Sequence, residues 1–277
     1  MGTSQSSAGP GANVSLVPPW AEPAPDPADP APAEAVPTPD PETLPGLTLP
    51  PTPNVAPVAP DRRFVSARRN LGAFAKTGDA VRMRRGVAHY VRSGYGGAGT
   101  MSRRLGSVST TARSLSRALD PGSTEAGFDR ALLQGKSAEE IIDAVVEAAR
   151  PQDGTLDAEA SREAIRNALS DLLGQHTDVD LLNLSDAQRE FVIERYAAHD
   201  VYRRFALDVG KHLVDNAPNA TIGLARLKQA RNYIQQTVAE SFRLLREAGQ
   251  AMTTANVRTT VAKALANSLA VFEGYLA

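Results

Sequence analysis

The distribution of proline sets how much of this chain is able to fold. Seventeen of the 20 prolines lie in residues 1–60, so the chain beyond them is nearly free of proline. Proline lacks a backbone donor and disfavours the α conformation of the residue before it, so a dense series of prolines prevents both helix and sheet. We therefore predict a disordered tail over residues 1–60 and a folded part that begins at residue 61.

The hydrophobic pattern beyond residue 60 has the period of a helix. Leu71 and Phe74 suit the buried face of a short helix that ends at Gly78, and Asp79 is suited to cap the next one. Thr100 is expected to cap a further helix that is rich in serine and threonine.

Two capping boxes mark the starts of later helices. Ser137 is followed three residues later by Glu140, and Ser185 by Gln188, each ahead of an apolar run with helical period. No stretch alternates between apolar and polar residues for long enough to indicate a sheet. We predict an all-α fold in which residues 121–277 form a helical bundle.

Charge divides the chain into three segments. Residues 1–60 carry six acidic residues and no lysine or arginine, residues 61–120 have a net charge of +10, and residues 121–277 have a net charge of −5. We expect an acidic tail, a basic helical region and a mildly acidic bundle.

The arginines of the basic segment are the candidate contact residues of the folded part. Such arginines neutralise the phosphates of nucleic acid or the carboxylates of an acidic partner, and Tyr90 and Tyr95 are candidates to stack on bases. The chain has 25 arginines and five lysines, so part of this charge also fits a compositional bias. The predicted nucleic-acid or partner contacts are Arg82, Arg84, Arg85, Arg92, Arg103 and Arg104.

A glycine-rich sequence, GYGGAG at residues 94–99, interrupts the basic segment. It fits the G-x-G-x-x-G template, but no strand is predicted before it, and a dinucleotide site requires one. A hinge between two helices is the favoured interpretation. The start of the following helix, near Arg103 and Arg104, is an alternative place for an anion.

The sequence shows no constellation of catalytic residues. It has no cysteine, no two of its four histidines have the i,i+3 or i,i+4 spacing of metal ligands, and no nucleophile is patterned with a base. We predict a protein that is not an enzyme and that needs no cofactor and no metal. There is no run of about 18 apolar residues and no recognisable signal peptide, so we expect a cytoplasmic protein without a membrane span.

The tail presents one reactive group and one apolar island. Removal of Met1 would leave Gly2 with a free amine, and the first lysine is Lys76. An α-amino group has a pKa of about 7.7–8.0, against about 10.4 for lysine, so more of it is neutral and nucleophilic at pH 7. The island LVPPW at residues 16–20 holds the single tryptophan, which favours a docking anchor. The candidate residues for partner binding are Thr3, Ser4, Leu16, Val17, Pro18 and Trp20.

Several of these stretches occur together in one known family. The start MGTS, the island LVPPW, the sequences ARRNLGAFAKTGD and VAHYVRSGYGGAGTMSRRLG and the turn PQDGTLD resemble QatB, the B component of bacterial Qat anti-phage defence systems. The resemblance covers most of the chain. It is strongest in residues 1–20 and 60–110 and weaker in the C-terminal helices.

The resemblance implies partners and a reaction. Qat systems combine this component with an ATPase, a QueC-like enzyme and a TatD-like DNase. Related defence enzymes attach a deazaguanine to the N-terminal glycine of a partner protein. By position, Gly2 would be the acceptor of the modification, and Thr3 and Ser4 would be the neighbours that the enzyme recognises.

Two functions stay open at this point. The first is a non-catalytic adaptor that is also the substrate of the QueC-like enzyme, and the lysine-free start of the chain favours it for the tail. The second is a subunit that binds DNA or RNA and delivers it to the partner nuclease. The step in charge at Asp61 favours this second function for the basic helices.

Overall fold

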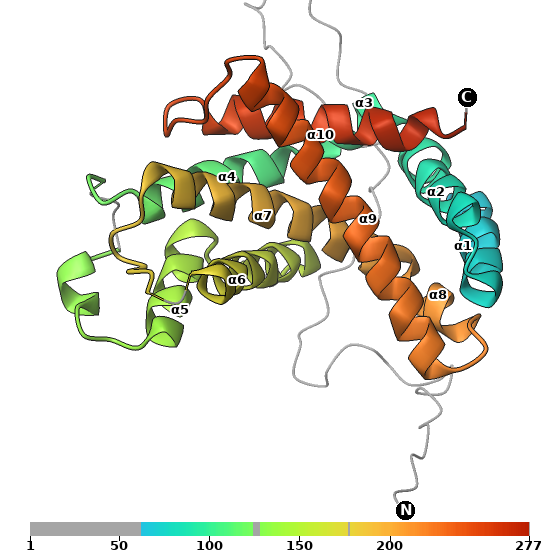
Figure 1. Cartoon of the computed structure of the whole chain (residues 1–277), viewed down its shortest axis with the longest axis horizontal. Coiled ribbons are helices and arrows are strands. Elements are labelled where there is room, and N and C mark those ends of the chain that lie inside the picture. The colour runs from blue at the N-terminus through green and yellow to red at the C-terminus, as the bar shows by residue number, and fades with distance from the viewer. Residues whose placement is uncertain (1–61, 124–127, 177, 277) are drawn as a thin grey trace, which may run out of the picture. The chain divides into compact units, whose positions relative to one another are not determined.

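A computed structural model of the chain describes residues 62–123, 128–176 and 178–276 (Figure 1). These residues form helices and no strand, so the all-α prediction is confirmed for them. The predicted disordered tail, residues 1–60, lies outside the described residues.

Short connections join the helices of the described part. In chain order the helices are α1 (Val65–Thr77), α2 (Ala80–His89), α3 (Ala98–Arg104), α4 (Gly106–Leu119), α5 (Ala138–Ala149), α6 (Leu156–Gln175), α7 (Asp186–Phe205), α8 (Lys211–Asp215), α9 (Ala220–Glu247) and α10 (Val257–Gly274). Two π-helical segments, η1 (Tyr90–Gly94) and η3 (Ala206–Gly210), continue α2 and α7, and a 3₁₀ turn, η2 (Arg130–Leu133), precedes α5.

The predicted helix boundaries are confirmed where cap chemistry is strong. The capping boxes at Ser137 and Ser185 are both complete, with the side chain and the backbone bonding in both directions. Asp79 accepts a hydrogen bond from the backbone N–H of Val81 at 2.8 Å. Gly78 ends α1 with a φ of 77°, a left-handed conformation that glycine adopts at little cost.

The predicted helix start at Thr100 is wrong. Thr100 lies inside α3, which begins at Ala98, and a break at Leu105 separates α3 from α4. Gly97 has a φ of 96°, which ends the preceding turn and lets the helix begin before Thr100.

The buried residues form one connected hydrophobic cluster, which extends from Phe64 to Phe272. Helix α6 packs along α7, α7 along α9, and α9 along α10. Helices α1 and α2 pair with each other, α1 also contacts α8, and α2 contacts α10 (Figure 1). The basic segment and the bundle segment therefore share one core, and α10 returns to the first helices of the described part.

The two π-helical segments are joined inside this core. The hydroxyls of Tyr90 and Tyr95 both donate to the Oδ2 of Asp208 in η3, at 2.9 and 2.7 Å. The ring of Tyr90 stacks on Phe64 and meets Phe205 edge-on, with centroids 5.5 and 5.2 Å apart. A π-helical turn carries an extra residue and often marks a special contact, which here ties the end of α2 to the end of α7.

Candidate functional site

The six predicted arginines lie on three consecutive elements and are all exposed. Helix α2 carries three of them, η1 carries one, and the last turn of α3 carries two. In that order they are Arg82, Arg84, Arg85, Arg92, Arg103 and Arg104.

None of these six arginines forms an ion pair with another described residue. The arginines of the later helices behave differently, because many of them have a carboxylate partner. These paired residues are Arg150, Arg162, Arg166, Arg189, Arg203, Arg204, Arg243 and Arg246. An exposed cation without a carboxylate partner keeps its charge available to an external anion, so the basic segment is the natural place for an acidic ligand.

Part of this charge follows one line along the surface. Arg82, Arg85, His89 and Arg92 are spaced by three, four and three residues along α2 and η1. Side chains at these spacings lie on the same face of a helix. We call these four residues, three charged arginines and the histidine that lies between two of them, the cation row.

A groove that is open to solvent lies beside the last three residues of the cation row, Arg85, His89 and Arg92. We call it the basic groove. Its walls come from α1, from α2 with η1, and from the residues that follow α10, and no carboxylate of a described residue lines it. The lining residues are Asn70, Arg85, His89, Arg92, Ser93, Tyr275 and Leu276.

His89 reports the charge of this groove. Burial lowers the pKa of His89, and the positive charges of Arg92 and Arg85 lower it further. Its Nδ1 atom is buried and has no hydrogen-bond partner among the described residues. The lowered pKa keeps His89 largely neutral at pH 7, so the positive charge of the groove comes from Arg85 and Arg92, and no carboxylate of the described lining residues offsets it.

Tyr275 supplies an aromatic ring at the same place. It is 41% exposed, and the guanidinium of Arg84 lies 5.4 Å from its ring centroid. The sequence did not predict a role for this residue. Its only signal is an aromatic residue just after the last helix, because its position beside α2 depends on the packing of α10.

The glycine-rich sequence forms a tight turn whose helix start is already occupied. Gly96 and Gly97 have φ values of 81° and 96°. The backbone N–H of Ala98, at the start of α3, donates to the carboxylate of Glu273 at 2.9 Å. The alternative anion site at this helix start thus holds a carboxylate of the chain itself.

The prediction that Tyr90 stacks on bases is wrong, because Tyr90 is 2% exposed and packs in the core. Tyr95 is half-buried, and it packs against Tyr90 with ring centroids 5.2 Å apart. Burial, followed by the hydrogen bond to Asp208, raises the pKa of Tyr95 to about 12. Both rings therefore serve the link between the two π-helical segments.

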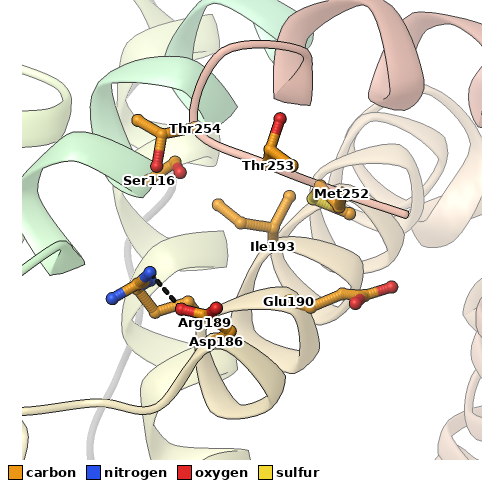
Figure 2. A pocket seen from close by; sticks show the side chains of 8 residues that line it. All are labelled: Ser116, Asp186, Arg189, Glu190, Ile193, Met252, Thr253 and Thr254. Atoms are coloured by element: carbon orange, nitrogen blue, oxygen red, sulfur yellow. Dashed lines mark hydrogen bonds and ion pairs between the residues drawn. The ribbon is translucent and has the colours of Figure 1, made fainter. Parts of the chain in front are cut away.

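A second pocket lies between the end of α4, the start of α7 and the segment before α10. Figure 2 shows Arg189 beside Asp186 on one side of this pocket and Met252 on the other, with Ile193 between them. Arg189 pairs with Asp186 and lies 3.5 Å from Asp120, which also accepts a hydrogen bond from Thr254. The charge of Arg189 is thus neutralised by carboxylates of the chain itself, so we assign no ligand to this pocket.

The described residues include no group of three or more histidine, aspartate or glutamate side chains that would hold a metal ion. Their helices also include none that is long and apolar enough to cross a membrane. The predicted acceptor Gly2 and the predicted docking residues lie outside the described residues and stay predictions. These docking residues are Thr3, Ser4, Leu16, Val17, Pro18 and Trp20.

Comparison with known protein families gives a match over more than half of the chain. A family model described as "Qat anti-phage system associated protein QatB" matches residues 96–272, which contain Arg103 and Arg104 but not the cation row. No curated protein and no solved structure matches the chain.

Proposed function

Because the chain belongs to the QatB family and is thus a component of a Qat anti-phage system, we propose that it is the system's adaptor and the substrate of a QueC-like partner. In this proposal the chain is not itself an enzyme. It acts in the cytoplasm, and its tail enters the active site of the partner. The ATPase and the TatD-like DNase of such systems are further candidate partners.

One observation carries the proposal: Gly2 is followed by no lysine until Lys76. After removal of Met1, the neutral amine of Gly2 attacks the electrophilic carbon of a deazaguanine that the partner has activated with ATP. An N–C bond forms, the amine loses a proton, and the nucleotide leaving group departs. The low pKa of an α-amine makes this terminus a better nucleophile at neutral pH than any lysine of the chain.

Intact-mass measurement of the protein purified with its neighbouring gene products tests the reaction. We expect the mass of the chain without Met1, increased by one deazaguanine less the atoms that are lost when the N–C bond forms. Gly2→Pro should abolish both this addition and protection against phage, because a ring amine fits and reacts differently. Gly11→Pro, the same change farther along the tail, is the matched control and should leave both intact. An unmodified Gly2 in a protecting strain would contradict the proposal.

The adaptor role rests on Trp20. An anchoring tryptophan contributes about 2 kcal/mol or more to binding, so Trp20→Ala should weaken the complex with the QueC-like enzyme by at least about thirtyfold. Titration calorimetry of the two purified proteins measures this. An unchanged dissociation constant would remove Trp20 from the interface.

The exposed arginines favour a second candidate function, a subunit that binds DNA or RNA. They lie on neighbouring elements and have no carboxylate partner among the described residues, unlike many arginines of the later helices. This function requires that binding of an oligonucleotide weakens steeply as salt is added. Nucleic-acid binding is compatible with the adaptor function, because the tail and the basic helices are separate parts of the chain.

A further inference from the structure

We propose that the basic groove binds the backbone phosphates of a single-stranded nucleic acid and that Tyr275 stacks on one of its bases. This inference rests on the second candidate function and deepens it, because it names the site and the form of nucleic acid.

The cation row provides a track for phosphates. It covers the eleven residues from Arg82 to Arg92, and ten rises of about 1.5 Å each make it about 15 Å long. Three of its four members are arginines, which bind phosphate through several N–H donors at once. A track of this length suits a strand with several phosphates better than it suits one small anion.

The carboxylates of this region have partners elsewhere. Asp79 caps α2, Asp208 accepts from Tyr90 and Tyr95, and Glu273 accepts from Ala98. They therefore do not line the basic groove, and its cations stay without a counter-charge among the described residues. A phosphate that enters the groove neutralises charges that otherwise repel one another.

Tyr275 favours a single strand over a duplex. The bases of a duplex are stacked within it, whereas those of a single strand are free to stack on an exposed aromatic ring. The ring of Tyr275 is both exposed and part of the groove wall, and Arg84 lies over it. An arginine next to a stacking ring is a common element of such platforms.

Fluorescence anisotropy of the full-length protein with a labelled twelve-residue oligothymidylate tests the site, at several salt concentrations. The double variant Arg85→Gln with Arg92→Gln should bind at least about tenfold more weakly. Its slope of log affinity against log salt should be smaller by about 1.4, because each phosphate contact on a single strand contributes about 0.7.

The matched control is the double variant Arg113→Gln with Arg258→Gln. It removes the same net charge from two exposed arginines outside the groove, and it should leave the salt slope unchanged. Tyr275→Leu should weaken binding by about fivefold or more, while Tyr275→Phe, which keeps the ring, should bind as the native chain does. Thermal unfolding by circular dichroism establishes that each variant is folded.

Three competitors identify the ligand. Unlabelled oligothymidylate should displace the label, while thymidine monophosphate and oligoglutamate of equal charge should compete poorly. Equal displacement by the monophosphate would make the groove a site for free phosphate, and equal displacement by oligoglutamate would make it a site for acidic protein. Either result overturns the proposal, as does equal binding of a duplex with no effect of Tyr275→Leu.

The experiment distinguishes a wrong assignment to the groove from a failure of nucleic-acid binding as a whole. If the native chain binds oligothymidylate and the groove variants bind equally well, the assignment to the groove is wrong and nucleic-acid binding stands. If the native chain does not bind at low salt, the second candidate function fails and this inference fails with it. The adaptor function is untouched by either result.

Discussion

At the scale of single residues, His199 links three helices and makes stability depend on pH. Its Nε2 lies 2.9 Å from Asp171 in α6, and its Nδ1 lies 3.1 Å from Gln235 in α9. Burial lowers the pKa of His199, and the pairing with Asp171 offsets only part of that effect. The folded chain thus resists protonation of a group that takes up a proton freely when unfolded.

The sign of the effect follows from proton linkage. Between the lowered folded pKa and the unfolded value of about 6.5, the unfolded state binds more protons, so stability falls as pH falls. We expect the free energy of unfolding, measured in urea, to decrease from pH 7 to pH 5.5. His199→Gln should make this decrease smaller, and His176→Gln, at an exposed position, should not. Equal pH slopes for all three proteins would contradict this account.

At the scale of helices, Gly86 sets how closely α1 and α2 approach. A Cβ atom at this position would lie 2.7 Å from the side chain of Leu71 and 3.3 Å from its backbone nitrogen. Gly86→Ala should therefore force the two helices apart and move the cation row, although alanine is the better helix former.

We expect Gly86→Ala to destabilise the fold by about 1–3 kcal/mol in urea unfolding. The matched control is Gly174→Ala in α6, where a Cβ would meet nothing within 4 Å. That change should be neutral or stabilise by up to about 1 kcal/mol, since it gains only helix propensity. A stabilised Gly86→Ala would show that the helix pair has room to relax.

The helices also show what sequence alone is able to predict. Local chemistry determines the capped starts at Ser137 and Ser185 and the stop at Gly78, and these predictions are confirmed. The break at Leu105 was missed, because α3 packs on α10 while α4 packs on α5 and α7 as well. The π-helical segments were missed for a similar reason, since they are held by Asp208, more than 100 residues from its tyrosine partners.

The sequence likewise predicts one part of the candidate site, and tertiary packing determines the rest. The exposure of Arg82, Arg85 and Arg92 follows from the amphipathic pattern of α2 and η1, which the sequence contains. The groove does not, because Asn70 and Tyr275 reach it only through the packing of α1 and α10 against α2. The burial of Tyr90 also depends on tertiary packing, because the local sequence does not distinguish an exposed ring that stacks on bases from a ring buried in the core.

At the scale of the whole molecule, the region matched by the family model is smaller than the region that shares one core. The match begins at residue 96, yet Tyr90 meets Phe205 and bonds to Asp208, and α1 contacts α8. A fragment of residues 96–277 would expose these buried surfaces to water.

We therefore predict that residues 62–277 unfold in one cooperative thermal transition, whereas residues 96–277 lose that cooperativity or aggregate. Circular dichroism and calorimetry of the two fragments measure this. A sharp transition of the shorter fragment, at the temperature of the longer one, would show that α1 and α2 contribute little to folding.

The shared core has a consequence for how this protein changes over generations. In residues 62–95, Leu71, Phe74 and Val87 are buried, so folding itself limits drift at these positions. Arg85 and Arg92 are exposed and lie outside the buried hydrophobic cluster, so folding leaves them freer to vary. Persistence of these arginines in diverged members, beside freely changing exposed neighbours, would therefore be a record of selection for what the surface binds.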